Sequence, residues 1–380
     1  MHVGMAVIFQ GQGENRSDRE VYQRELRLGD MAEPLGFESI WGVEHHFTEY
    51  TMCPDVLQHL TYFAARTEKV QLGSMVVVLP WHSPIRVAEQ VTMLDHFSNG
   101  RLIFGMGRGL GKVEFEGFHV NQEDSREFFV EAAQMILSGL EKGYCEYDGK
   151  LVKQTKRYLR PGPFKSFKGR TYAAAVSPES SAIMAKLGVG LLIIPQKPWE
   201  AVTQELNDYK RIFREVNGTD APPPINAAWV ICDKNADRAR ENAYKYIGAY
   251  WNSVIRHYDL KGTHLMNMRG YESYKRMQEM VNAPGGADAM IEFFLSLQVW
   301  GTPEQCYNKI VEVATKTGGE AFTGIFSYGG MPYDYAEENL KTFAKEVMPE
   351  LKKRIPLHDQ VIARAGVGPA ARHDDFRIIA

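Results

Sequence analysis

Residues 36–49 read GFESIWGVEHHFTE, a mostly apolar segment that ends abruptly in one acid and two imidazoles. Its first eight residues are typical of a buried β-strand. In a barrel of alternating strands and helices, chemistry lies at the carboxyl ends of the strands, which makes Glu44, His45 and His46 candidate catalytic residues. Adjacent residues of an extended chain point to opposite sides, so at most one of the two histidines faces a given pocket. One core and one surface histidine is an equally good interpretation of the composition alone.

Short apolar runs alternate with longer amphipathic segments along the 380-residue chain. We expect strands at residues 3–9, 39–43, 70–78, 102–106, 171–175, 190–194, 225–231 and 324–327. Helical periodicity occurs between them, at residues 18–35, 55–66, 84–97, 125–137, 178–187, 199–215 and 335–347. Eight strands with intervening helices predict an α/β fold of the closed (β/α)8 TIM-barrel type.

Two segments interrupt this alternation. Residues 144–156 are expected to form a hairpin around Asp148-Gly149. Residues 256–288 are long and rich in Met, Tyr and His, and we interpret them as a lid insertion, with a peripheral helical decoration as the alternative. We therefore expect a single barrel domain over residues 1–354, followed by a C-terminal tail at residues 355–380.

The composition argues against several classes of partner. Lys and Arg number 44 against 47 Asp and Glu, and a net charge of −3 gives no reason to expect nucleic acid or an anionic membrane. No apolar run approaches the roughly 18 residues that span a bilayer, and the N-terminus lacks the basic region of a signal peptide. We expect a cytoplasmic protein. The four scattered cysteines form no CxxC pair, so no structural zinc site is expected; they are Cys53, Cys145, Cys232 and Cys306.

Two segments are candidate phosphate sites. Residues 104–111, FGMGRGLG, follow a predicted strand, but their glycines do not have the dinucleotide-binding spacing. What remains is a turn that carries Arg108, either for a phosphate or for a structural acid such as Glu44. The second segment joins a strand to a helix at Ser177 and Ser180. Hydroxyls at a helix N-terminus can bind an anion, and Ser177 can equally be a plain N-cap.

Other catalytic classes have less support in the sequence. No GxSxG nucleophile elbow occurs. His45, His46 and Glu49 carry metal-ligating atoms, but the two imidazoles diverge on an extended strand end and their spacing matches no recognised ligand set. No metal is therefore expected.

Several short motifs, taken together and in order, resemble the bacterial luciferase-like flavin-dependent monooxygenases, and the luciferase α subunit in particular. They are EHHFTE at 44–49, VLP at 78–80, LD at 94–95 with GR at 100–101, FG at 104–105 with RGL at 108–110, DSR at 124–126, GTPEQC at 301–306 and VMP at 347–349. The similarity runs from about residue 3 to residue 353 and is poor over residues 256–288. Ordered agreement of this kind is more specific than any single motif.

The resemblance implies a (β/α)8 barrel that holds FMN at its C-terminal mouth. His45 falls on the family's catalytic histidine and His46 on its neighbour, while Glu44 would lie near the isoalloxazine ring. Met75-Val76 falls where the family has a non-proline cis peptide bond beneath the ring. The cofactor-binding residues implied in this way are Glu44, Ser74, Met75, Val76, Arg108, Val176, Ser177 and Ser180.

The resemblance also implies an activity. Reduced FMN, supplied by a separate NAD(P)H:flavin reductase, would react with dioxygen to a flavin hydroperoxide that oxygenates a small, largely apolar organic substrate. A homodimer through residues 55–66 and 84–97 is expected by the same likeness. The alternatives are a deazaflavin-dependent hydride-transfer enzyme and a non-catalytic flavin-binding protein.

The sequence departs from luciferase at four positions that bear on light emission. Gly107 replaces a reactive cysteine, and the others are Gly111 for a tyrosine, Val176 for a glutamate and Pro195 for a tryptophan. Light emission is therefore not expected, while a general monooxygenase activity is.

Overall fold

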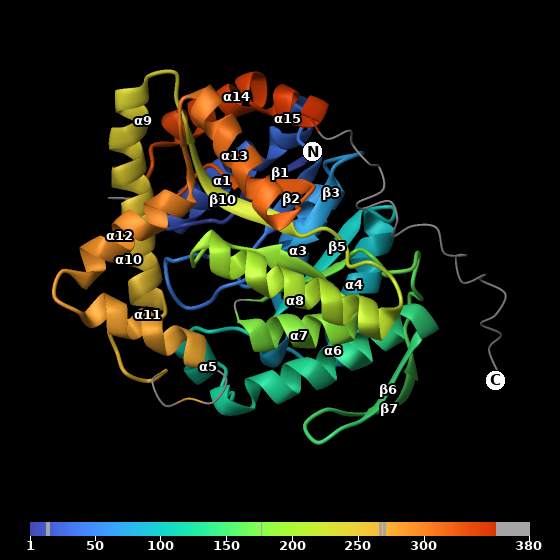
Figure 1. The fold of residues 1–380 in the computed structure, drawn as a ribbon. Coiled ribbons are helices and arrows are strands. Elements are labelled where there is room, and N and C mark those ends of the chain that lie inside the picture. Colours follow the sequence, from blue (N-terminus) through green and yellow to red (C-terminus); the bar gives the residue numbers. More distant parts are fainter. Residues whose placement is uncertain (13–15, 176, 266–267, 269–270, 355–380) are drawn as a thin grey trace.

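The computed structural model describes residues 1–12, 16–175, 177–265, 268 and 271–354, and Figure 1 shows their arrangement. The predicted tail at residues 355–380 and the predicted site residue Val176 lie outside the described residues. Among the described residues, no helix is long and apolar enough to cross a membrane.

Eight parallel strands of the described chain close into a barrel. Hydrogen bonds connect them in the order β12-β1-β2-β3-β5-β8-β9-β10, and β10 pairs with β12 to complete the circle. The strands are β1 (His2–Val7), β2 (Ser39–Gly42), β3 (Gln71–Ser74), β5 (Leu102–Gly107), β8 (Thr171–Ala174), β9 (Gly190–Ile193), β10 (Ile225–Cys232) and β12 (Ala321–Ile325). The prediction of a (β/α)8 TIM barrel is confirmed.

Helices surround the barrel (Figure 1). The connecting helices are α1 (Asp18–Asp30), α2 (Ala32–Leu35), α3 (Val56–Ala64), α4 (Pro84–Phe97), α6 (Ser125–Lys142), α7 (Pro178–Leu187), α8 (Trp199–Asn217), α13 (Pro303–Thr317), α14 (Tyr333–Glu346) and α15 (Met348–Arg354). Side chains cap several of their N-termini and satisfy backbone N–H groups that have no partner within the helix. Asp55 caps α3, Ser177 caps α7, and Thr302 forms a capping box with Gln305 at α13.

A second group of helices gathers on one side of the barrel (gold and orange in Figure 1). It comprises α9 (Ala236–Asn242), a π-helical turn at Ala243–Ile247, α10 (Gly248–His257), α11 (Glu272–Asn282) and α12 (Gly286–Leu297). The predicted insertion at residues 256–288 thus contains the end of α10, all of α11 and the start of α12. Its role as a lid stays a prediction.

The strand boundaries differ from the prediction in three places. The expected strand at residues 70–78 is interrupted by a cis peptide bond between Met75 and Val76, after which β4 (Val77–Val78) pairs with β5. The last barrel strand, β12, begins at Ala321, earlier than the apolar pattern indicated. A short strand, β11 (Val299–Gly301), pairs with β10 and was not predicted. The predicted hairpin is confirmed as β6 (Tyr144–Asp148) and β7 (Lys153–Tyr158).

Glycines on neighbouring strands make room for the largest side chain of β2. Trp41 is completely buried and its indole N–H donates to the Ser39 hydroxyl at 2.8 Å. A Cβ atom at Gly73 would lie 2.2 Å from the Trp41 ring, and one at Gly4 would lie 2.9 Å from its nitrogen. The aromatic ring therefore fills space that only glycine leaves open on the two adjacent strands. All four cysteines are also buried, and none forms a disulfide.

A buried ion pair ties α4 to the entry of β8. The Arg170 guanidinium donates to both carboxylate oxygens of Asp95, at 2.5 and 2.7 Å, and also to the Leu102 carbonyl at 3.0 Å. Arg170 is 3% exposed and Asp95 is fully buried. A buried charge that loses its partner is strongly destabilising, so this contact constrains the fold more than a surface pair would.

We predict that Asp95→Ala lowers the free energy of unfolding by about 3–5 kcal/mol, because it leaves the Arg170 charge buried without its partner. Urea denaturation followed by circular dichroism measures the loss. The matched control is Asp30→Ala, which removes an exposed carboxylate paired with Arg66 at 2.6 Å and should cost only about 0–1 kcal/mol. Equal losses in the two variants would contradict the prediction.

Candidate functional site

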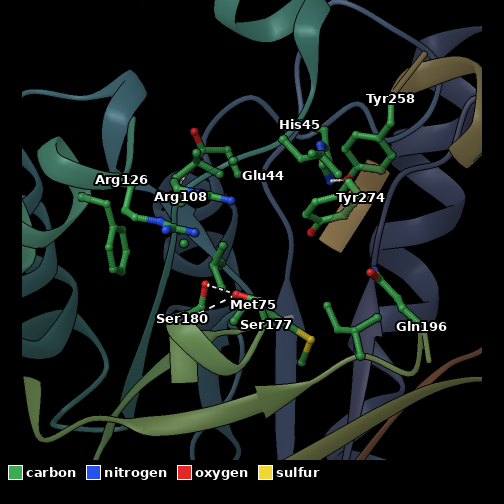
Figure 2. A pocket seen from close by; sticks show the side chains of 18 of the residues that line it. Glu44, His45, Met75, Arg108, Arg126, Ser177, Ser180, Gln196, Tyr258 and Tyr274 are labelled. Carbon is green, nitrogen blue, oxygen red and sulfur yellow. Dashed lines mark hydrogen bonds between the residues drawn. The ribbon is translucent and has the colours of Figure 1, made fainter. Parts of the chain in front are cut away.

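A cavity of about 1260 Å³, counted out to its open mouth, lies at the carboxyl ends of the strands. Its walls come from the ends of β2 and β5, the Met75–Val76 junction, the loop before α7, and the helices α10 and α11 (Figure 2). It brings together most of the site residues that the sequence predicted: Glu44, His45, Met75, Val76, Arg108, Ser177 and Ser180. The cis peptide bond expected at Met75-Val76 is confirmed.

Two predicted residues lie outside the lining of this cavity. Ser74 is fully buried, and its hydroxyl donates to the Gly105 carbonyl and accepts from the Gly105 N–H, both at 2.8 Å. His46 turns away from His45, as the alternation of an extended strand requires, and packs edge-on against Trp81 and Phe118. Ser74 therefore ties β3 to β5, and His46 supports the cavity wall.

Two guanidinium groups and two hydroxyls meet at one end of the cavity (Figure 2). Arg108 lies with its guanidinium carbon 3.9 Å from the centre of the Tyr271 ring, and Arg126 forms an ion pair with Glu179 at 2.5 Å. Ser177 caps α7 by accepting from the Ser180 N–H at 3.2 Å and donates to the Ser180 hydroxyl at 2.9 Å. The N-cap is thus present, and the same turn faces two arginines. This donor set is suited to an anion such as phosphate.

Arg126 was not predicted as a site residue. The segment DSR at 124–126 was noted only as a shared motif, because the sequence does not show that the first turn of α6 lies beside the first turn of α7. Only the folded chain shows that Arg126 is a cation next to the candidate phosphate turn at Ser177.

Glu44 is held rigidly by three donors. Its Oε1 lies 2.6 Å from His82 Nε2 and 3.1 Å from His46 Nε2, while its Oε2 accepts from the Val78 N–H at 2.9 Å. Burial alone would raise the pKa of Glu44, but these hydrogen bonds outweigh it and lower the pKa below its ordinary value. An ionised, buried carboxylate therefore joins the end of β2 to the chain that follows the cis peptide bond.

His45 faces the cavity and is held from behind by a second buried carboxylate. Its Nδ1 lies 3.0 Å from Glu114 Oε1, and its Nε2 lies 3.4 Å from the Tyr258 hydroxyl. Glu114 belongs to the short helix α5 (Lys112–Gly117) and is fully buried. Burial raises its pKa, but the neighbouring imidazoles of His45 and His257 outweigh this and bring the pKa of Glu114 to about 2. Sequence reasoning missed Glu114, whose only signal is its place after the glycine-rich turn.

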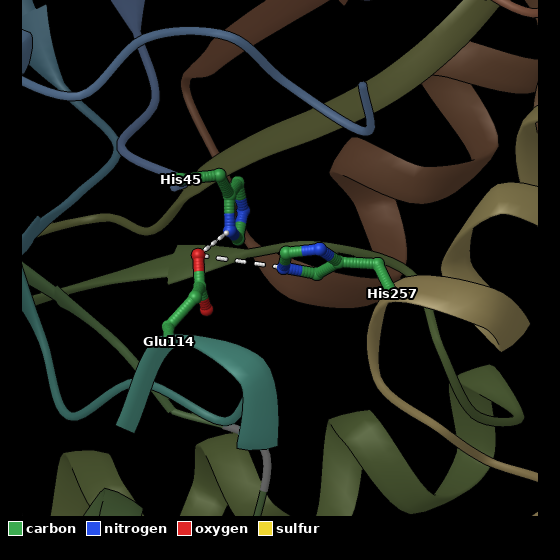
Figure 3. A group of neighbouring side chains, drawn as sticks. All are labelled: His45, Glu114 and His257. Atoms are coloured by element: carbon green, nitrogen blue, oxygen red, sulfur yellow. Dashed lines mark hydrogen bonds and ion pairs between the residues drawn. The ribbon is translucent and has the colours of Figure 1, made fainter. Parts of the chain in front are cut away.

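The metal-ligating atoms of His45, Glu114 and His257 all lie within 4.8 Å of one another (Figure 3). Glu114 Oε1 also accepts from the backbone N–H of His46 at 2.9 Å. A hydrogen bond between His45 and Glu114 explains their short distance, and no metal ion is needed to explain it. The absence of a metal stays a prediction.

A second cavity of about 710 Å³ opens beside His45. It shares seven lining residues with the first cavity, and its walls are mainly apolar or aromatic; the shared residues are His45, Met75, Ile194, Gln196, Trp251, Val254 and Tyr258. The aromatic part of its lining consists of Tyr50, Trp229, Tyr250, Trp251, Tyr258 and Phe294. An apolar pocket of this kind, next to a titratable group, is typical of a site for an organic substrate.

The sequence profile described as luciferase-like monooxygenase matches residues 1–321. The alkanal monooxygenase alpha chains of Photorhabdus luminescens and Photobacterium leiognathi are 27% and 28% identical to this chain. These alignments cover 89% and 91% of this chain and 94% and 98% of the relatives.

Three solved structures have the same fold. A monooxygenase from Streptomyces bottropensis superposes with a TM-score of 0.75 at 22% identity, over 92% of this chain and 99% of that one. The oxygenating constituent of 3,6-diketocamphane monooxygenase from Pseudomonas putida, in complex with FMN, gives 0.70 at 16% identity, over 92% and 99%. The coenzyme F420-dependent tetrahydromethanopterin reductase from Methanopyrus kandleri gives 0.63 at 20% identity, over 92% and 99%.

At these identities the structural likeness establishes the fold alone. The sequence profile goes further, because it covers most of the chain, including the strand ends that carry Glu44, His45 and Arg108. This chain therefore belongs to the luciferase-like monooxygenase family.

Proposed function

We propose that this protein is an FMN-dependent monooxygenase that oxygenates a small, largely apolar organic substrate and receives reduced FMN from a separate NAD(P)H:flavin reductase. One observation carries the proposal: a single cavity has an anion site of two arginines at one end and His45, beside an aromatic-walled pocket, at the other. That spacing of charge and apolar surface suits a phosphate-bearing ring cofactor beside an apolar substrate.

The residues present fit FMN. Arg108, Arg126 and the Ser177 turn would bind its phosphate, since they gather positive charge and donors at the N-terminus of α7. The Met75–Val76 segment would support the ring. Gly107 lets the Val76 side chain pack directly against β5, because a Cβ atom at Gly107 would lie 2.4 Å from that side chain.

Reduced FMN supplies the two electrons with which dioxygen is activated, so that one oxygen atom enters the substrate and the other leaves as water. His45 then holds or accepts a proton at Nε2, which faces the cavity. Glu44 fixes the wall on which the ring would lie. The insertion at residues 256–288 contributes Tyr258, Leu260, Tyr274 and Met277 to the cavity wall and would keep water out as a lid.

Replacing His45 with alanine is expected to lower product formation by about 10²–10⁴-fold, because a positioned general base is lost. FMN affinity should stay roughly unchanged, and consumed oxygen should be released as hydrogen peroxide. Oxygen-electrode and product measurements on the same reaction check this. His96→Ala, which changes an exposed histidine bonded to the Gly162 carbonyl, is the control. Unchanged product turnover by the His45 variant would exclude the role.

Replacing Arg108 with alanine is expected to weaken FMN binding by about 1.5–3 kcal/mol, roughly 10- to 150-fold, through loss of a charge-assisted contact. Riboflavin, which lacks the phosphate, should bind the variant and the native protein equally. Fluorescence titration with both flavins measures this difference. Lys153→Ala, on the exposed strand β7, serves as the control. An equal loss for riboflavin would remove Arg108 from the phosphate site.

The second candidate function is a deazaflavin-dependent hydride transfer without oxygen. The fold likeness to an F420-dependent reductase supports this candidate. Both cofactors carry a phosphate that the same arginine–serine site would bind. Mixing the protein with reduced FMN, oxygen and candidate substrates separates the two: oxygen incorporation from labelled dioxygen supports the monooxygenase. Bound flavin without oxygen consumption above background, across many substrates, would indicate a non-catalytic flavin-binding protein.

We propose a homodimer through α3 and α4, which pack against each other. Their outer faces expose Tyr62, Met93 and Phe97 to 37%, 43% and 58%. Large apolar side chains gathered on one face are typical of a protein interface.

Phe97→Asp is expected to shift the protein to monomer in sedimentation analysis without changing its circular dichroism. Val216→Asp, which changes an exposed apolar residue of α8, should leave the dimer intact. A dimer that persists in both variants would contradict this interface.

A further inference from the structure

We propose that a directed chain of polar contacts, from Thr48 through His257 and Glu114, places the proton of neutral His45 on Nδ1 and so presents the Nε2 lone pair to the cavity. Figure 3 shows the part of this chain formed by His45, Glu114 and His257. Glu114 and His257 are then positioning residues that act through His45. The inference rests on the proposed function only in taking His45 as the proton-accepting group.

The carboxylate end of the chain fixes its direction. Glu114 is fully buried with a pKa of about 2, where the imidazoles outweigh burial, so it is ionised and accepts hydrogen bonds without donating them. His45 Nδ1, 3.0 Å from Glu114 Oε1, must therefore be the donor. In a neutral ring the other nitrogen then carries the lone pair, and His45 Nε2 is the atom that lies toward the Tyr258 hydroxyl at the cavity.

The threonine end is compatible with the same direction. Burial lowers the pKa of His257, against the opposing effect of Glu114, and favours a neutral ring. The ionised Glu114 Oε1 lies 3.4 Å from His257 Nε2, which places the single proton of this ring on Nε2. His257 Nδ1 is then an acceptor, and the Thr48 hydroxyl 2.7 Å away can donate to it while accepting from the Tyr50 N–H at 3.4 Å. Both imidazoles thus turn an N–H toward the same carboxylate.

The groups that surround His45 are consistent with this assignment. Glu114 approaches from α5, Tyr50 lies edge-on with ring centres 4.8 Å apart, and His257 and Tyr258 come from the end of α10. Glu44, the preceding residue, is committed to His46 and His82. The described neighbours that contact His45 Nδ1 and Nε2 are Glu114 and Tyr258 respectively, and only Glu114 is ionised.

His257 also connects this chain to the insertion. It is the last residue of α10, directly at the start of residues 256–288, and it is buried against Tyr50 with stacked rings 4.6 Å apart. A neutral His257 ring does not neutralise the Glu114 charge. Its contribution is geometric: it contacts the same oxygen, Glu114 Oε1, that His45 Nδ1 contacts.

Nitrogen-15 NMR of the imidazole rings tests the proposal on the protein without flavin, at an alkaline pH where histidines are neutral. The chain has 11 histidines, and the signals of His45 and His257 are identified by their loss in His45→Ala and His257→Asn. We expect His45 in the Nδ1–H form and His257 in the Nε2–H form. His96 is the internal reference, because its Nε2 lies 2.8 Å from the Gly162 carbonyl and must carry its proton.

Two substitutions at Glu114 form a matched pair. Glu114→Leu removes the acceptor, so the His45 proton should move to Nε2, where the Tyr258 hydroxyl is in reach, and turnover should fall by about 10²–10⁴-fold, as for a lost base. Glu114→Gln keeps an acceptor oxygen and should retain the Nδ1–H form. Thr48→Val removes the donor to His257 Nδ1 and should leave His257 in the Nε2–H form, because Glu114 still faces that nitrogen.

His45 in the Nε2–H form in the native protein, or in the Nδ1–H form in Glu114→Leu, would overturn the proposal. Tight equimolar binding of Zn²⁺ in calorimetry, lost in both Glu114→Gln and His257→Asn, would also overturn it, because an ion would then hold these atoms. If the tautomers are as expected but reduced FMN and oxygen give no product, the proposed function fails and this assignment stands.

Discussion

Two buried carboxylates connect the segments that follow the carboxyl ends of the barrel strands. Glu44 joins the end of β2 to the segment after the cis peptide bond, and Glu114 joins the same strand end to α5 and, through His257, to α10. A carboxylate without partners would be costly in such a place, since a buried charge loses its hydration. Each of these two is surrounded by ring N–H and backbone N–H donors. Both carboxylates position His45. Glu44 is the preceding residue and fixes the backbone there, while Glu114 contacts the His45 ring through Nδ1.

The barrel itself was predictable because its signal is local. Each strand is an apolar run bounded by turn residues, and helix starts such as Asp55 and Ser177 are marked by capping side chains next to them. The predicted strand boundaries were wrong where the apolar periodicity carries no information about them. Residues 70–78 are mostly apolar, yet a cis peptide bond at Met75-Val76 interrupts the strand, and the three-residue strand β11 is too short to show a pattern.

The candidate site was predictable only in part, for the same reason. His45 and Arg108 stand at strand ends and could be found from the alternation of strands and helices. Glu114 is 69 residues from His45, and His257 is 209 residues from Thr48. Contacts across such separations depend on how the barrel closes and on where the insertion folds back. No local pattern around Arg126 or His257 marks them as site residues. Arg126 became visible only with the cavity, and His257 only with its contact to Glu114.

The burial of all four cysteines has a consequence if the proposed monooxygenase function holds. Thiols are oxidised as thiolates, so their reactivity falls when the proton is held. Burial raises the pKa of the Cys145 thiol to about 11 and moves that of Cys53 further in the same direction. Hydrogen peroxide released by an unproductive turnover would then meet four thiols shielded from solvent, and those of Cys53 and Cys145 would in addition be protonated and resistant to sulfenic acid formation.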